Sequence, residues 1–270
     1  MNWIYPITIV LYSLSVFCYF IDFLQNNRKV NRVAFWLLSV VWLLQTGYFI
    51  IRAISLGQVL AISSLDGLFF YAWTVVTVSL VINWYFRVDF IVFFTNLVGF
   101  AMLAFSLFPR NIDRLEALHS LLSLELLLIH ISFIFLSYAA FTLAFAYSIM
   151  YVIQHQMLKR KKWGKRLQRF GSLTSLDKMA FIFTMIGAPL LLIGIIQGYI
   201  WATVQLDEFQ WFDPKVLSSF LTLLIYLVYL YNRVVKHKQG YGFALLNIAG
   251  FLVLCINYFL SSQYTSFHLW

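Results

Sequence analysis

The sequence predicts an all-α fold: a polytopic membrane protein built as a bundle of eight transmembrane helices, with both termini outside. Composition is the first observation behind this prediction. Of the 270 residues, 62% are hydrophobic and only 11% are charged, whereas a soluble domain is roughly one quarter charged. A soluble globule with so few charges would expose an apolar surface that aggregates, so a soluble enzyme and a secreted scaffold are excluded.

Long apolar runs are the second observation, because a helix needs about 20 apolar residues to cross the hydrocarbon layer. These runs lack the polar–apolar alternation of membrane β-strands, so helices are expected. The fifth run is longer than a bilayer requires, and we expect it to tilt or protrude. The eight runs lie near residues 2–24, 33–54, 65–86, 89–108, 121–153, 179–203, 215–235 and 243–262, and residues 1–270 should form a single integral membrane domain.

Basic residues predict the orientation, since cytoplasmic loops are enriched in Lys and Arg. Of the 19 basic residues, 15 fall on one side of the predicted spans, and Arg52, Arg110, Arg114 and Lys215 fall on the other. The richer side is therefore predicted to be cytoplasmic. The net charge of +9 then reflects topology, and no nucleic-acid partner is expected.

The longest polar stretch is a basic loop near residues 154–178, on the predicted cytoplasmic side. Its core has the sequence KRKKWGKRLQRF. Three interpretations are open: the loop enforces the orientation, it lies on anionic lipid as a short amphipathic helix, or it docks a soluble partner.

Residues for ordinary enzymatic chemistry are missing, so the protein is not expected to be an enzyme. The sequence contains no GxSxG, HExxH, Walker or GxGxxG motif. Cys18 and Cys255 form neither a CxxC nor a CxxCH motif, which excludes a zinc site of that type and covalently attached haem. Ionisable groups that a bilayer would penalise are few, and they are Asp66, Glu125, His130 and His268.

An aromatic segment, residues 201–215, is predicted to form an external loop between the sixth and seventh spans. It contains Trp201, Trp211 and Phe212. An interfacial aromatic belt would explain such residues in most membrane proteins. Asp213 followed by Pro214 predicts an ordered helix start, because Asp caps helices and Pro suits their first position.

Several segments together resemble a family. The sequence is similar to the CcsA/CcmC/CcmF group of haem-handling cytochrome c assembly membrane proteins, and within it to the HemX branch. The resemblance is clear over about residues 125–270, where the family has a tryptophan-rich external loop between flanking histidines. The segments that carry it are 195–202, 211–215, 224–230, 130–132 with 136–140, and 250–251 with 266–268.

The resemblance implies a bound cofactor, non-covalent haem b, at an external cleft. His130 and His268 would be the two axial ligands of the haem iron. Taken alone, His130 would more often be an interhelical hydrogen bonder and His268 part of a terminal tail. The residues implied to bind the cofactor are His130, His268, Trp201, Trp211, Phe212 and Asp213.

The resemblance also implies a function in the bacterial plasma membrane: lowering the level of glutamyl-tRNA reductase, which controls haem biosynthesis. The cytoplasmic loop 154–178 would contact the reductase or a membrane protease. The alternative is delivery or export of haem for cytochrome c maturation. Against the alternative, Tyr231 stands where the family carries a histidine implicated in passing haem across the membrane, and Phe212 replaces a tryptophan of the loop.

Overall fold

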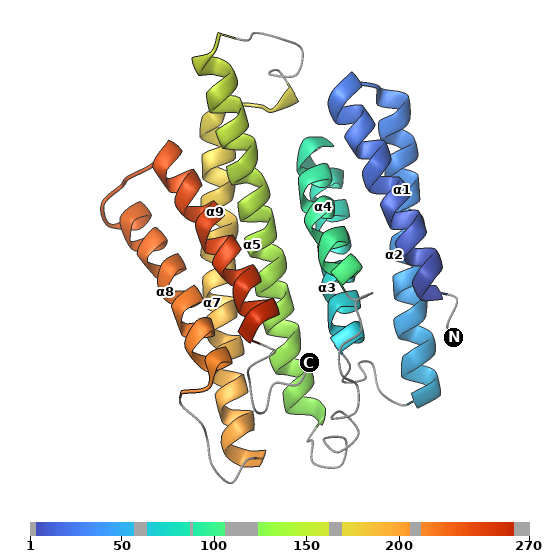
Figure 1. The fold of residues 1–270 in the computed structure, drawn as a ribbon, viewed down its shortest axis with the longest axis vertical. Helices are drawn as coiled ribbons and strands as arrows, with labels where there is room; N and C mark the ends of the chain where they lie inside the picture. The colour runs from blue at the N-terminus through green and yellow to red at the C-terminus, as the bar shows by residue number, and fades with distance from the viewer. Residues whose placement is uncertain are drawn as a thin grey trace. The chain divides into compact units, whose positions relative to one another are not determined.

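The computed structural model describes residues 4–56, 64–86, 89–105, 124–161, 169–205 and 212–261. Within these ranges the regular elements are eight α-helices and one short π-helical segment, η3 (Figure 1). Their bounds are α1 (Ile4–Gln25), α2 (Arg28–Leu56), α3 (Ser64–Phe86), α4 (Asp89–Phe105), α5 (Leu124–Lys159), α7 (Leu173–Gln205), α8 (Pro214–Val234), α9 (Tyr241–Ile256) and η3 (Asn257–Ser261).

Each predicted apolar run is a helix, so the all-α, multi-pass membrane fold is confirmed. Seven of the helices in the described ranges are long and apolar enough to cross a membrane, and α4 contains a shorter apolar stretch, Phe90–Phe105. The fifth run is long, as predicted, because α5 has 36 residues. The location of the two termini outside stays a prediction.

The chain forms two compact units. Unit 1 comprises Met1–Arg110 and Gly164–Phe170, and thus contains α1 to α4. Unit 2 comprises Asn111–Trp163 and Gly171–Trp270, and contains α5, α7, α8 and α9. That both belong to one integral membrane domain stays a prediction.

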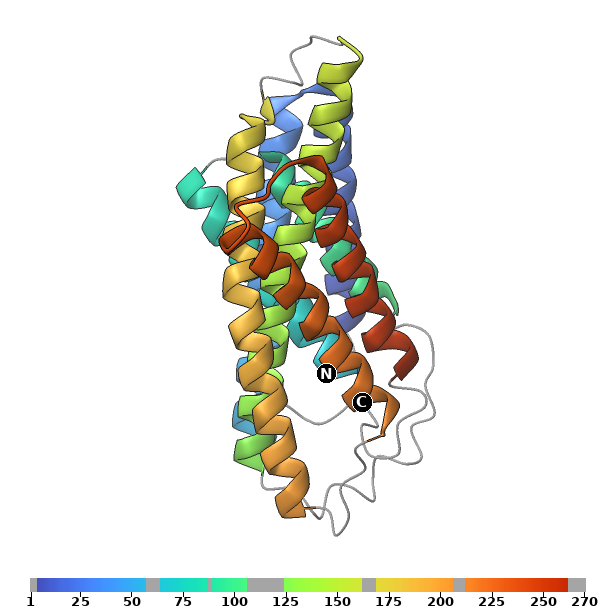
Figure 2. The same cartoon turned by 90° about the vertical axis from the view of Figure 1, so that its left-hand side faces the viewer.

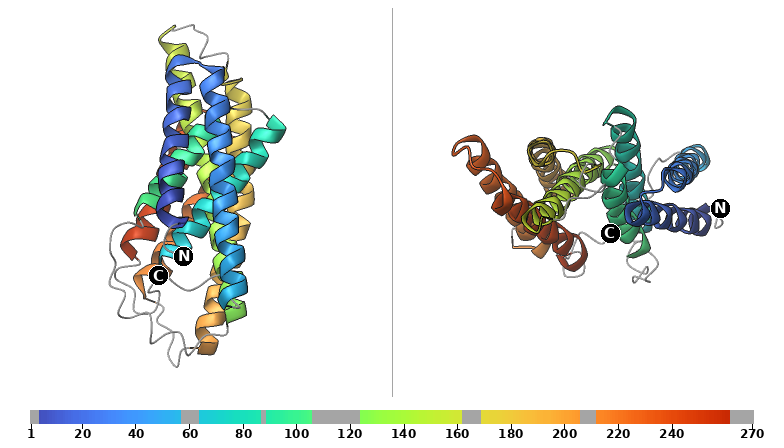
Figure 3. Two further views of the ribbon diagram at one scale, coloured as in Figure 1. Left: turned by 90° about the vertical axis from the view of Figure 1, so that its right-hand side faces the viewer. Right: turned by 90° about the horizontal axis from the view of Figure 1, so that it is seen from above.

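Unit 1 is built on the α1–α2 hairpin, whose helices run side by side (Figure 3). The buried face of α1 is largely polar. Apart from Val16, its residues are Thr8, Tyr12, Ser15, Tyr19 and Asp22, which recur every three or four positions. The Tyr12 hydroxyl donates to Asn96 Oδ1 at 2.9 Å, and Asn96 Nδ2 donates to Ser79 Oγ at 2.8 Å. Because hydrocarbon offers no partner, such hydrogen bonds between helices fix which faces meet.

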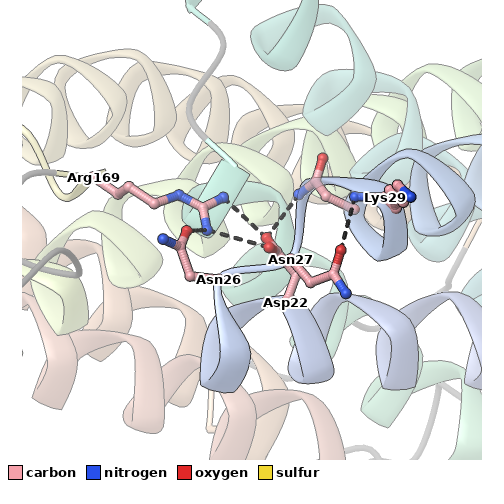
Figure 4. Close-up of polar contacts among 6 residues, drawn as sticks. Asp22, Asn26, Asn27, Lys29 and Arg169 are labelled. Carbon is pink, nitrogen blue, oxygen red and sulfur yellow. Dashed lines mark hydrogen bonds and ion pairs between the residues drawn. The ribbon is translucent and has the colours of Figure 1, made fainter.

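One end of unit 1 carries a buried ion pair (Figure 4). The Asp22 carboxylate accepts hydrogen bonds from both terminal nitrogens of Arg169, at 3.2 and 2.9 Å, and from Asn31 Nδ2 at 2.9 Å. The Arg169 guanidinium lies over the Phe90 ring at 4.6 Å, and the buried Phe170 packs against the same ring. The core of the predicted basic loop therefore ends in two residues, Arg169 and Phe170, that are held on α1 and α4.

Unit 2 is built on α5 and α7, which pack against each other along their length (Figures 1 and 2). Both helices extend beyond the predicted spans: α5 continues to Lys159 and α7 begins at Leu173. Most of the predicted loop 154–178 outside its core is therefore helical, and residues 162–168 lie outside the described ranges. At the α7 start, Asp177 binds Arg233 of α8 at 2.6 Å, and the Arg233 guanidinium lies over the Phe181 ring.

Candidate functional site

A seam of glycines on α7 lets α5 approach closely. At three positions, a Cβ atom added to the glycine would lie only 2.6 to 2.8 Å from a side chain of α5. Small residues allow this kind of contact in membranes, where helices associate by close packing. The three pairs are Gly187 with Phe141, Gly194 with Ile134, and Gly198 with His130.

His130 is half-buried on α5 at one end of this seam. Its Nδ1 atom lies 2.7 Å from the Gly194 carbonyl oxygen on α7. Because a carbonyl oxygen only accepts, Nδ1 must carry the hydrogen and donate it. This fixes the neutral tautomer whose other nitrogen, Nε2, keeps its lone pair.

The fixed tautomer has a chemical consequence. Metal-binding histidines almost always donate their second ring nitrogen to a carbonyl, a carboxylate or water, which orients the ring and increases its basicity. With Nδ1 donating to the Gly194 carbonyl, Nε2 of His130 is the ring nitrogen whose lone pair can bind a metal. The imidazole is therefore both a hydrogen bonder between helices, as its sequence context predicts, and a competent ligand through Nε2.

Trp201 lies on the same face of α7 as Gly194 and Gly198, one turn nearer the helix end. Its side chain is buried. The predicted external loop 201–215 thus starts too early: α7 continues to Gln205, so residues 201–205 are helical. An apolar run in the sequence indicates the part of a helix that lies inside lipid. It does not show whether the helix continues for another turn beyond the lipid.

The start of α8 has the capped geometry that the sequence predicts. Asp213 is the N-cap, its carboxylate accepts the Lys215 backbone N–H at 2.8 Å, and Pro214 is the first helical residue. The Asp213 side chain is buried. Phe212, immediately before the cap, is 88% exposed and forms a projecting aromatic ring.

The start of α8 is also joined to the end of α9. Lys215 Nζ donates to the Asn257 carbonyl at 3.2 Å and lies over the Tyr258 ring. Ser218 Oγ donates to Asn257 Oδ1 at 2.8 Å, and Tyr258 packs edge-on against Tyr138 of α5. The segment η3, which ends seven residues before His268 in the sequence, is thereby held against α8 and α5.

His130, Trp201 and the capped start of α8 all belong to unit 2. Trp211 and His268 lie outside the described residues, as does the side chain of Glu125. Within the described part of the chain there is no group of three or more His, Cys, Asp or Glu side chains that could hold a metal ion.

Sequence reasoning missed two features. Gly194 and Gly198 have the GxxxG spacing of close helix contacts, and that spacing is visible in the sequence. No local signal marks Asp22 and Arg169 as a pair, because 147 positions separate them.

Comparison with known proteins identifies the family. A sequence model described as "Cytochrome C assembly protein" matches residues 61–268, and the chain is 51% identical over 261 residues to the protein HemX of Bacillus subtilis (strain 168), covering 97% of this chain and 95% of that one. The chain belongs to the cytochrome c assembly protein family, in its HemX branch. The resemblance predicted from the sequence is thereby confirmed.

Other members of the family are similar over different lengths. The protein HemX of Brevibacillus brevis is 44% identical over 269 residues, which cover 100% of this chain and 98% of that protein. The cytochrome c biogenesis protein CcsA of Chlamydomonas reinhardtii is 30% identical over 159 residues, which cover 58% of this chain and 43% of that protein. The family match spans both candidate histidines and ends at His268.

Proposed function

We propose that this HemX-type membrane protein binds haem b non-covalently at the His130 end of unit 2 and lowers the level of glutamyl-tRNA reductase in response. In this proposal His130 and His268 are the axial ligands of the iron. Trp201, Trp211 and Phe212 cover the porphyrin, and Asp213 holds the start of α8 in place. The site would face the outside of the bacterial plasma membrane.

The observation that carries the proposal is the hydrogen bond from His130 Nδ1 to the Gly194 carbonyl. It holds the ring in one tautomer and one orientation, with Nε2 available to a metal. An orienting hydrogen bond of this kind is typical of a histidine that binds a metal through its other ring nitrogen.

The surroundings fit a haem in two further respects. Trp201 is buried on α7, one helical turn beyond Gly198, whose Cβ position lies against His130, and porphyrins are buried well against such aromatic rings. Lys215 is a cation near the same end of unit 2, held by Asn257 and Tyr258, and could neutralise a propionate.

The regulatory half of the proposal rests on the family branch and on the cations at the far end of α5. Lys159, Arg160 and Lys161 are all exposed there, in the predicted loop 154–178. They would contact the reductase or a membrane protease whose action lowers the reductase level. Haem binding at one end can affect partner binding at the other only if unit 2 has two conformations. Haem and the partner must each bind these two conformations with different affinities.

Haem delivery for cytochrome c maturation is the second candidate, because the CcsA relative is a cytochrome c biogenesis protein. Tyr231 argues against it. This residue is half exposed near the end of α8, and the Lys236 ammonium lies over its ring. A tyrosine paired with a lysine in this way suits anchoring at the membrane interface.

Two experiments test the proposal. The first is a visible spectrum of the purified protein beside its His130→Ala and His268→Ala variants. A low-spin bis-imidazole spectrum that is lost in both variants supports the site, and equal haem content in all three proteins refutes it.

The second experiment is deletion of the gene. Regulation predicts a higher level of glutamyl-tRNA reductase with normal cytochromes c. Loss of holo-cytochrome c with an unchanged reductase level would instead establish delivery.

A further inference from the structure

An aromatic layer lies in the middle of unit 2. The rings of Phe141 from α5 and Tyr226 from α8 stack face to face, with centroids 3.7 Å apart and planes inclined by only 6°. Both side chains are fully buried. At this spacing the two rings are in van der Waals contact over their whole faces, so nothing fits between them.

Glycines close the layer on both sides. A Cβ atom at Gly187 of α7 would lie 2.8 Å from Phe141, and one at Gly250 of α9 would lie 3.3 Å from Tyr226. Gly187 of α7 therefore lies against the Phe141 ring, and Gly250 of α9 lies against the Tyr226 ring. All four helices of unit 2 contribute, and each ring is pressed against a helix with no side chain in between.

Two further stacks reinforce the same region of α5. Phe145 stacks on Phe251 of α9 with centroids 4.3 Å apart, and Tyr147 stacks on Phe183 of α7 at 5.7 Å. Within seven residues, α5 thus forms a ring stack with each of the other three helices.

The layer lies well away from the candidate haem ligand. Phe141 follows His130 by 11 positions, which is about 16 Å along a helix with a rise of 1.5 Å per residue. Phe141 is also at the centre of α5, which runs from Leu124 to Lys159. The stack therefore separates the His130 end of unit 2 from the end that carries the basic residues.

We propose that the Phe141–Tyr226 stack seals unit 2, so that a porphyrin held at His130 enters and leaves by the same end. This inference rests on the proposed haem site and specifies its regulation: haem is a signal read at one end, and no passage runs through the helices of unit 2. Information reaches the basic end only through a change in helix packing around the aromatic layer.

Transfer of haem across vesicles tests the seal. The full-length protein is reconstituted in lipid vesicles that enclose an apo haem-binding protein, and haem is added outside. Vesicles without the membrane protein give the rate of transfer through lipid alone. The opened variant is Phe141→Ala with Tyr226→Ala, and the matched control is Phe220→Ala, which removes a ring from the half-exposed face of α8.

The seal predicts that the wild-type protein and the Phe220→Ala variant transfer haem at the rate of protein-free vesicles, and that the opened variant is several-fold faster. A wild-type rate clearly above that of protein-free vesicles would overturn the seal. An opened variant no faster than wild type would remove the role of this ring pair. If the opened variant fails to fold, a wild-type rate above that of protein-free vesicles still refutes the seal.

A spectrum of each reconstituted protein separates this inference from the proposed function. Absence of a His130-dependent haem spectrum in the wild type refutes the proposed site, whatever the transfer rate. A normal spectrum combined with rapid wild-type transfer refutes only the seal.

Discussion

Replacing Gly198 by alanine should weaken haem binding although residue 198 itself touches no ligand. The new Cβ atom would lie 2.6 Å from Cε1 and 2.9 Å from Nδ1 of the His130 ring. The ring must therefore retreat by about 1 Å to regain ordinary van der Waals separation. That movement lengthens or breaks the 2.7 Å hydrogen bond from Nδ1 to the Gly194 carbonyl.

The expected loss of haem affinity follows from the role of this hydrogen bond in orienting His130. Its net contribution to stability is only about 1 kcal/mol. Loss of the group that orients a metal-binding histidine, however, typically reduces metal affinity by about 10- to 100-fold. We therefore expect Gly198→Ala to fold and to bind haem about 10- to 100-fold more weakly.

Haem titration of the purified apo-protein, followed by visible absorbance, measures this affinity. Gly242→Ala is the matched control, because that glycine is also in unit 2 and a Cβ atom there meets nothing within 4 Å. If Gly198→Ala binds haem as tightly as the wild type and the control, the Gly194 carbonyl does not position the ligand and the reasoning fails.

Three other predictions concern the ion pair, the helix cap and the basic end. Arg169→Met should lower the free energy of unfolding by about 3–5 kcal/mol, because it leaves the buried Asp22 charge without its partner. Thermal unfolding in detergent should show that adding Asp22→Asn restores part of the lost stability. If the double variant is no more stable than Arg169→Met, the pairing is contradicted. Asp213→Ala should lower the free energy of unfolding by about 1 kcal/mol, and Asp213→Asn should lower it much less, since Asn also caps helices. Equal losses of stability in the two variants would exclude a capping role. Glutamine at residues 159–162 should abolish reductase control and preserve the haem spectrum, and control that survives would remove the docking role.

The helices could be predicted because hydrocarbon imposes one dominant requirement on sequence. A run such as 215–235 must be apolar and about 20 residues long, and the structure places α8 within a residue of it. The ends of the helices were harder to predict from the sequence. Residues 154–159 and 173–178 are polar enough to resemble a loop, but α5 and α7 continue through them because helices need not stop at the lipid boundary.

The site was predictable only in part. Asp213 and Pro214 are adjacent, so their cap could be predicted from local preference alone. The contact between His130 and Gly194 depends on the register of two helices 64 positions apart, and apolar patterns do not fix that register.

The stack of Phe141 on Tyr226 could not be predicted from the sequence, for a different reason. With aromatic residues making up 20% of the chain, sequence alone does not select which rings meet. The small residue beside each ring, Gly187 or Gly250, was the one available clue.

Ligation of haem iron by Nε2 of His130 is tested most directly by chemical rescue. A His130→Gly variant leaves room for free imidazole at the position of the missing ring. We predict that the low-spin spectrum is lost in this variant and returns when imidazole is added. A His130→Gly protein that keeps the wild-type spectrum without imidazole would contradict the claim.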